Sequence, residues 1–442
     1  MKKRTVKRII ALAAVVFTLG FSAVFGGCSA LGGRDGINGK DLNIYDIYEA
    51  AKVESGNLEL TFAEFLKEYL SYTPSEIEQA ASIKGAINRS LLSSVSVQSY
   101  FTENSKPVAY NGSGVIIDVD ADKGDMTVVT NCHVVYSARS KRYASDDGYA
   151  DSINIWLYGS ESAYTEVYQD NAISANIIAA SKTYDVAVLQ VTGSELVKKS
   201  KARAAKWSDS EEVFLGETAY AIGNANSQGM SANVGYISKD LEVVKVDLGT
   251  TANSEMFDYN VMRTSAAINS GNSGGGLFNL NGEVIGLVNS KGKDDAVGFG
   301  YALTAASTKR VVQSMLDNYS AVRGEVHYVN RVRHGINVEV KDMYSTGLNQ
   351  SGYAEICEKV TVSSVSLSAA TGKLESGDWL KNIKIMRGTE QIENMDINRE
   401  HNFHDAMLSV RAGDEVIFTV QRGDSEIVQN ITFVESNFEK VV

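Results

Sequence analysis

The sequence predicts a mainly β protein built from two or three domains. Its 442 residues exceed the roughly 250–300 residues at which a single hydrophobic core stops growing. A composition that is 44% hydrophobic and 22% charged is ordinary for a globular protein. Between residues 90 and 304 the apolar runs are short and β-branched, with turn residues between them. This spacing favours a β-barrel or β-sandwich over alternating strands and helices.

Charge and cysteine content exclude two classes of protein. The chain has 54 acidic against 42 basic side chains, a formal charge of −12. Such a surface repels phosphate backbones, so we expect no nucleic-acid partner. Three scattered cysteines, Cys28, Cys132 and Cys357, cannot form a disulfide framework.

The N-terminus has the pattern of an export signal. Residues 2–8 are strongly basic, residues 9–26 form an apolar run, and two glycines precede Cys28. The pattern resembles a bacterial lipoprotein signal, which implies a signal peptide over residues 1–27 and a lipid on Cys28. The alternative is an uncleaved membrane anchor, because 18 residues just reach spanning length. Both interpretations place the body on the extracytoplasmic face of the cell membrane, and the first anchors it there by lipid.

Residues 28–85 are predicted to form a tether with short helices. A Gly-rich stretch at 32–40 is typical of a flexible spacer. Thr61 and Glu64 form a capping box before an apolar helical pattern, and Thr73-Pro74 begins a second one. No residue in the tether indicates chemistry.

Strands are predicted in the body at residues 114–119, 126–130, 153–158, 186–191, 218–222 and 283–288. His133 follows one of these strands and Asp185 opens another. A carboxylate so close to the core needs a hydrogen-bond partner, and an imidazole N–H is such a partner. Each residue alone is a weak signal.

The segment 266–276, AAINSGNSGGG, is a stronger signal. A nucleophilic serine needs an exposed hydroxyl, with backbone N–H groups converging where an oxyanion forms. Glycines on both sides of Ser273 permit the backbone conformations of such a turn. A structural Gly-rich turn explains the glycines alone, but not their coincidence with the loops of His133 and Asp185.

Together these segments resemble the HtrA/Deg-type serine proteases. The corresponding stretches occur in order at residues 112–118, 130–135, 185–189, 221–224, 266–277, 286–290 and 298–302. The resemblance implies a chymotrypsin-like double β-barrel, a trypsin-like protease domain that we place at residues 86–322. It also implies no cofactor and no metal.

The resemblance assigns roles to individual residues. His133 would be the general base, Asp185 would orient and stabilise it, and Ser273 would attack the peptide carbonyl. The oxyanion hole would be formed by Gly271, Asn272 and Ser273, with the N–H groups of the first and last as donors. The substrate pocket would be lined by Ile268, Gly298, Phe299, Gly300 and Tyr301, which suggests small apolar side chains such as Val or Ala.

Three departures from the family pattern concern the catalytic loops. Cys132 replaces an Asn before the histidine, and we expect it to be a small buried filler. Ser270 and Gly276 stand where proline is common, which gives the oxyanion loop more freedom. Residues 224–233 and 244–259 match activation loops of the family, and residues 136–151 are expected to extend a surface loop.

After a predicted helix at residues 307–319, the pattern returns to strands at 336–340, 360–365, 415–420 and 427–433. Two Gly-Asp turns, at 377–378 and 413–414, resemble those of a PDZ domain, which we place at residues 330–436. The loop for a peptide carboxylate would be formed by Arg333, His334, Gly335 and Ile336. His401 and His404 are expected on a solvated helix face, because no further ligand pattern supports a metal there.

The leading hypothesis is a membrane-anchored serine endopeptidase that cleaves unfolded or damaged exported proteins. C-terminal peptides at the PDZ groove would recruit substrates or activate the enzyme. One alternative is a catalytically silent binder or holdase of the same fold. Another is a protease that processes a single native target. A homotrimer is possible by the same resemblance.

Overall fold

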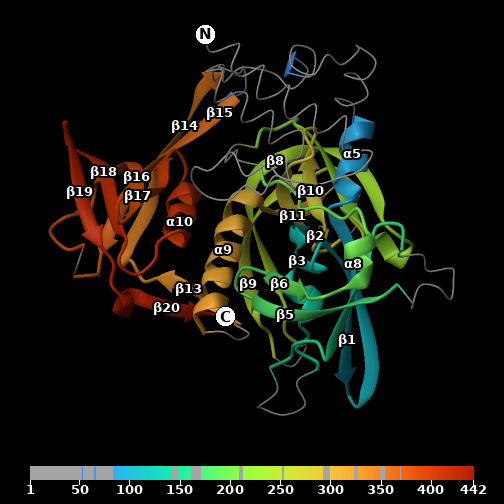
Figure 1. The fold of residues 1–442 in the computed structure, drawn as a ribbon. Helices are drawn as coiled ribbons and strands as arrows, with labels where there is room; N and C mark the ends of the chain where they lie inside the picture. The colour runs from blue at the N-terminus through green and yellow to red at the C-terminus, as the bar shows by residue number, and fades with distance from the viewer. Residues whose placement is uncertain are drawn as a thin grey trace, which may run out of the picture. The chain divides into compact units, whose positions relative to one another are not determined.

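The computed structural model describes residues 52, 64, 65, 83–140, 147–160, 171–208, 213–250, 253–291, 299–322, 327–348, 354–368 and 370–442. The expected signal peptide, Cys28 and nearly all of the tether lie outside these residues. Within the described ranges, no helix is long and apolar enough to cross a membrane. Contacts divide the chain into two units, Met1–Asn88 and Arg89–Val442. The prediction of a mainly β protein is confirmed (Figure 1).

The first part of the second unit is a closed barrel of six strands in the order β1-β2-β3-β6-β5-β4. It follows α5 (Ile83–Leu91), whose last residues belong to this unit. Its core is aliphatic, because the inward positions of every strand are Val, Ile, Leu, Met or Ala. The strands are β1 (Ser94–Glu103), β2 (Lys106–Asp120), β3 (Asp125–Thr130), β4 (Ser152–Leu157), β5 (Ile173–Ser181) and β6 (Val186–Val191). The helical turns α6 (Cys132–Val135) and α8 (Glu195–Lys199) follow β3 and β6.

A second closed barrel has the order β10-β11-β12-β9-β8-β7. Its elements are β7 (Thr218–Gly223), η1 (Ala225–Ser227), β8 (Ser231–Asp247), β9 (Met256–Thr264), β10 (Gly276–Asn279), β11 (Val284–Lys291) and β12 (Gly300–Thr304). The expectation of a loop over 244–259 is wrong for residues 244–247 and 256–259, which pair with each other in the β8–β9 ribbon. Exposed and half-buried positions alternate along the end of β8, so its polar face resembles a loop in sequence.

The rest of the unit begins with α9 (Ala305–Val322), which contains the predicted helix and contacts both β11 and α10 (Figure 1). A six-stranded sheet follows in the order β14-β15-β16-β18-β19, with β17 paired to β16, and a short sheet joins β13 to β20. The edge strand of the larger sheet is β14. The elements are β13 (Val329–Val332), β14 (Ile336–Leu348), β15 (Ala354–Val365), β16 (Trp379–Arg387), β17 (Glu390–Asp396), α10 (Glu400–Leu408), β18 (Glu415–Arg422), β19 (Ser425–Thr432), η2 (Glu435–Asn437) and β20 (Phe438–Val441).

Candidate active site

Asp185 lies directly before β6 and is fully buried. Its backbone adopts φ 50°, the left-handed region that costs a non-glycine residue energy. The side chain of Asn131 donates to its carbonyl at 3.0 Å and so supports this conformation. Three donors surround the carboxylate: the His133 backbone N–H at 2.9 Å, the His133 ring and the amide of Asn289. A buried carboxylate is therefore fully hydrogen-bonded, as its burial requires.

His133 lies in the helical turn α6, with its Nδ1 atom 2.7 Å from Asp185 Oδ2. Burial lowers the pKa of the imidazole, but the charge and hydrogen bond of Asp185 together outweigh burial and raise it above 6.5. Because Nδ1 faces the carboxylate, Nε2 is the nitrogen left to exchange a proton with a substrate or nucleophile. The geometry is that of a general base with an acidic orienting partner.

Ser273 comes from the second barrel, on the loop before β10. Its Oγ donates to the carbonyl oxygen of Asn289 at 2.9 Å. The side chain of the same Asn289 donates to Asp185 Oδ2. One residue therefore joins the serine to the Asp–His pair, and the three residues predicted for catalysis lie at one place on the interface between the barrels.

The loop around Ser273 presents two backbone donors. Asn272 N–H donates to the Asn269 carbonyl at 3.0 Å. The N–H groups of Gly271 and Ser273, in contrast, have no hydrogen-bond acceptor among the described residues. These are the two groups predicted to bind an oxyanion. Asn272 is buried, and neither polar atom of its side chain has a described partner.

Two glycines of this loop cannot be replaced without a clash. Gly271 has φ 95°, and a Cβ there would lie 2.2 Å from the carbonyl oxygen of Asn224. Gly274 has φ 82°, and its Cβ would lie 2.1 Å from Thr130 Oγ1, at the end of the strand that leads to His133. The glycines therefore permit both the turn and its close approach to the first barrel.

Four of the five residues predicted for the substrate pocket are described, and Gly298 lies outside the described residues. Ile268 is buried in the core of the second barrel. A Cβ on Gly300 would lie 2.4 Å from Ile268 Cγ1, so these two residues are in contact. Phe299 is exposed, with Arg263 4.5 Å from its ring centroid, and Tyr301 is half-buried.

Cys132 is fully buried in the core of the first barrel, as expected for a filler. Burial is the main reason that the pKa of its thiol lies well above the usual value, and the charge of Asp185 raises it further. The thiol therefore stays protonated at neutral pH and is a poor nucleophile.

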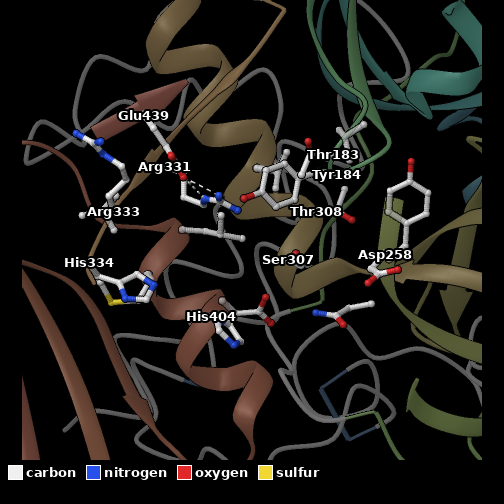
Figure 2. A pocket seen from close by; sticks show the side chains of 18 of the residues that line it. Thr183, Tyr184, Asp258, Ser307, Thr308, Arg331, Arg333, His334, His404 and Glu439 are labelled. Carbon is white, nitrogen blue, oxygen red and sulfur yellow. Dashed lines mark hydrogen bonds and ion pairs between the residues drawn. The ribbon is translucent and has the colours of Figure 1, made fainter. Parts of the chain in front are cut away.

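The predicted carboxylate loop lines a cavity of about 400 Å³ (Figure 2). His334 and Gly335 face it, together with His404 of α10 and Tyr184 of the loop that carries Asp185. Arg331, on the same wall, binds Glu439 at 2.6 Å.

His334 is turned back onto its own loop. Its Nδ1 accepts the Ile336 N–H at 3.1 Å, and its ring packs edge-on against Phe403. Burial is the main cause that lowers the pKa of His334 to about 4, with His404 and Arg331 lowering it further and Glu439 opposing them. The imidazole is therefore neutral at pH 7 and able to accept. The N–H groups of His334 and Gly335 have no acceptor among the described residues.

Arg333, the first residue of that loop, is directed elsewhere. Its guanidinium donates to the Ser436 carbonyl at 2.9 Å, and its N–H donates to the Asn437 carbonyl at 2.6 Å. The side chain is thus tied to the segment before β20.

Two further residues of the site, Asn289 and Ser113, have no role predicted from the sequence. Asn289 is a buried polar side chain in the apolar run of β11 and donates to Asp185, and Ser113 is a buried serine between two glycines of β2. A polar residue inside an apolar strand is the signal that identifies both positions, because burying it requires a partner.

Comparison with known proteins finds likenesses over the part of the chain that carries this candidate site. A trypsin-like peptidase domain model matches residues 112–287. The serine protease Do-like HtrB of Bacillus subtilis is 34% identical over 47% of this chain and 38% of its own length. The periplasmic serine endoprotease DegP of Escherichia coli is 32% identical over 49% of this chain and 38% of its own.

The serine protease Do-like HtrA of Lactococcus lactis is 26% identical, over 67% of this chain and 66% of its own. The solved HtrA-type protease AlgW with a tripeptide aligns with 79% of this chain and 96% of its own, at 21% identity and a TM-score of 0.47. This chain spans only about two-fifths of the length of HtrB and of DegP. Residues 112–287 thus match a trypsin-like peptidase domain, and about half of the chain is similar to HtrA-type serine proteases.

Proposed function

We propose that this protein is a serine endopeptidase. The observation that carries the proposal is the position of Asn289, which binds the Asp185 carboxylate with its side chain and the Ser273 hydroxyl with its carbonyl. This supports a triad in which the serine of one barrel acts with the Asp–His pair of the other. The N–H groups of Gly271 and Ser273, which have no acceptor among the described residues, would supply the anion site that acyl transfer needs.

The reaction begins when the Ser273 hydroxyl leaves the Asn289 carbonyl and turns to His133 Nε2. Its oxygen attacks the peptide carbonyl carbon, its proton passes to Nε2, and the carbonyl oxygen becomes an oxyanion bound by the two N–H groups. Asp185 stabilises the imidazolium that forms. The C–N bond then breaks as Nε2–H gives its proton to the leaving amine.

An acyl ester on Ser273 remains. Water attacks it, losing a proton to His133, and that proton returns to the Ser273 oxygen as the ester C–O bond breaks. Ile268 against Gly300 leaves room for a small apolar residue before the cleaved bond, so we propose cleavage after Val or Ala.

The test uses a fluorophosphonate probe on the full-length protein, beside Ser273→Ala. Such probes report an activated serine without a known substrate. We expect wild type to be labelled and Ser273→Ala not to be. An unlabelled wild type, even with unfolded casein and apolar C-terminal peptides present, would instead support the silent binder. The engagement of the Ser273 hydroxyl with Asn289 gives that second function a structural basis.

We propose that substrates are unfolded exported proteins and that residues 330–436 form a PDZ domain for C-terminal peptides. The support is the position of β14 at the edge of its sheet among the described strands, together with the loop before it. A peptide strand adds to such an edge while loop N–H groups bind its carboxylate. Comparing hydrolysis of unfolded casein with that of folded proteins tests substrate breadth. If the enzyme instead processes a single native target, neither casein nor the folded proteins should be cleaved efficiently.

We further propose a lipid-anchored, extracytoplasmic protein, with Cys28 as the modified residue and a homotrimer as its assembly. The basic, apolar and Gly-Gly-Cys pattern of the N-terminus supports the anchor. Incorporation of labelled palmitate that is lost in Cys28→Ser tests the anchor. Sedimentation of the detergent-solubilised protein tests the assembly, and a monomeric mass would contradict the trimer.

A further inference from the structure

The oxyanion loop is held from outside by two donors, one from each barrel. The Ser270 carbonyl accepts the Asn226 N–H at 2.7 Å, from the turn after β7. The Gly271 carbonyl accepts the hydroxyl of Ser113 at 2.7 Å, from β2 of the first barrel. Consecutive carbonyls of the loop are therefore each fixed by a group outside it.

Gly271 needs this external support because the position requires glycine, and glycine is the most flexible residue. Only glycine fits where a Cβ would lie 2.2 Å from the Asn224 carbonyl oxygen. Glycine also rotates more freely than any other residue, so it does not hold a conformation by itself. Because a peptide unit is planar, fixing the Ser270 carbonyl directs the Gly271 N–H to the opposite side, toward the oxyanion hole. Fixing the Gly271 carbonyl holds the next peptide plane.

Ser113 is completely buried, and its polar groups bind three parts of the site. Its Oγ donates to Gly271 and accepts the Asn224 N–H at 2.8 Å. Its backbone N–H donates to the Ser273 carbonyl at 2.8 Å, and its carbonyl accepts Thr130 Oγ1 at 2.7 Å. One residue thus contacts the oxyanion loop, the nucleophile and the strand that leads to His133.

We propose that Ser113 is a positioning residue whose hydroxyl fixes the peptide plane after Gly271. With Asn226 fixing the plane before it, Gly271 is held on both sides and its N–H stays directed at the oxyanion hole. Ser113 touches neither the substrate nor the reacting atoms, and it acts on the rate through Gly271. The proposal rests on the proposed peptidase function.

The decisive variant is Ser113→Ala in the full-length protein. Losing the hydroxyl releases the Gly271 carbonyl, so only the peptide plane before Gly271 remains fixed, and the flexible glycine holds its N–H less firmly for the transition state. We expect kcat per titrated site to fall about 10- to 100-fold, less than the 10²–10³ cost of deleting an oxyanion donor outright. KM should change less than about 3-fold, because the substrate-binding surface is unaltered.

The second readout is the inhibition constant of a peptide aldehyde with Val at its reactive end. The aldehyde forms a tetrahedral oxyanion on Ser273, so its affinity reports the oxyanion hole directly. We expect Ser113→Ala to lower the affinity for the aldehyde by the same factor by which it lowers kcat. The corresponding peptide alcohol, which has no carbonyl group and forms no oxyanion, should bind both proteins equally.

Two further variants separate positioning from folding. Ser99→Ala removes a buried serine hydroxyl of β1 that has no described hydrogen-bond partner, and should leave kcat and aldehyde affinity unchanged. Ser113→Cys keeps a similar shape with a weaker donor, and should fall between wild type and alanine. If alanine prevents folding, the cysteine variant carries the test.

The proposal is overturned if Ser113→Ala or Ser113→Cys lowers the melting temperature or the titrated fraction while kcat per site and aldehyde affinity stay at wild-type values. An equal loss in Ser99→Ala would also overturn it. Failure of the proposed function gives a different result, because wild type itself would then show no hydrolysis that depends on Ser273.

Discussion

The two loops that we propose as anion sites differ in their resting states. At Gly271 and Ser273 the N–H groups have no described acceptor, and the carbonyls of Ser270 and Gly271 accept from Asn226 and Ser113. In the loop before β14, the N–H groups of His334 and Gly335 also have no described acceptor, but the Ile336 N–H is already bonded to His334 Nδ1. On this proposal the first loop is preorganised for a charge that appears in the transition state. The second would exchange one internal partner for its ligand, which lowers affinity by about the net value of one hydrogen bond, roughly 1 kcal/mol.

The largest effect should come from Asp185→Asn, which disables one site and leaves the other intact. An amide cannot hold the correct imidazole tautomer or stabilise the imidazolium, so we expect kcat to fall about 10⁴-fold. Binding of an apolar C-terminal peptide, measured by fluorescence anisotropy, should not change. A kcat within 10-fold of wild type would contradict the role of Asp185.

Acid should act on the two sites in opposite directions. His133 works as a base only when neutral, and Asp185 raises its pKa above 6.5. We therefore expect kcat/KM to fall about 10-fold per pH unit below a midpoint above 6.5. A bound carboxylate beside His334 raises the pKa of that imidazole, so peptide affinity should increase as the pH falls from 7 to 5. If kcat/KM and peptide affinity both fell, or both rose, as the pH is lowered, the proposed difference between the two loops would be contradicted.

His334→Leu tests whether the internal hydrogen bond competes with the ligand, because the variant removes the acceptor of the Ile336 N–H. We expect the affinity for an apolar C-terminal peptide to rise about 5-fold, the equivalent of one net hydrogen bond. The same peptide with an amidated C-terminus is the control and should bind neither protein tightly. Unchanged affinity in the variant would show that the His334 contact does not compete with the ligand.

The smallest effect should be on stability in mild acid. Burial lowers the pKa of His334 and of His401 to about 4, below the unfolded value of about 6.5. The unfolded chain therefore takes up protons first, and stability is lost as the pH falls from 6.5 toward 4. Calorimetry on Ser273→Ala should show a melting temperature that drops over this range. The drop should be smaller with His334→Leu added, and an equal drop would contradict the assignment.

How much of the site is visible in sequence depends on whether its determinants are local. Each residue of the predicted triad lies in a short segment whose sequence indicates its role, most clearly the glycines around Ser273; the other two are His133 and Asp185. Asn289 and Ser113 also bind across the interface between the two barrels, to Asp185 and Gly271, which are more than 100 positions away in the sequence. A local pattern can mark each position as a polar residue in a strand, but it does not identify the distant partner.

The fold follows the same rule. Strands with a buried apolar core, such as β6, were predicted with the bounds that the structure has. The end of β8 and the start of β9 were taken for a loop, because exposed and half-buried positions alternate there. Pairing between these two strands, rather than burial, makes them a ribbon, and pairing is not visible in one sequence.

The backbone N–H of Ser113 donates to the Ser273 carbonyl and so links the two barrels. Hydrogen–deuterium exchange of this amide can be measured. Because the residue is fully buried, its amide exchanges with solvent only when the two barrels move apart or the protein unfolds. Its exchange rate, compared with that of a β6 amide inside one barrel, therefore measures how often the interface opens. An inhibitor that bridges the barrels should slow the Ser113 amide more than the β6 amide.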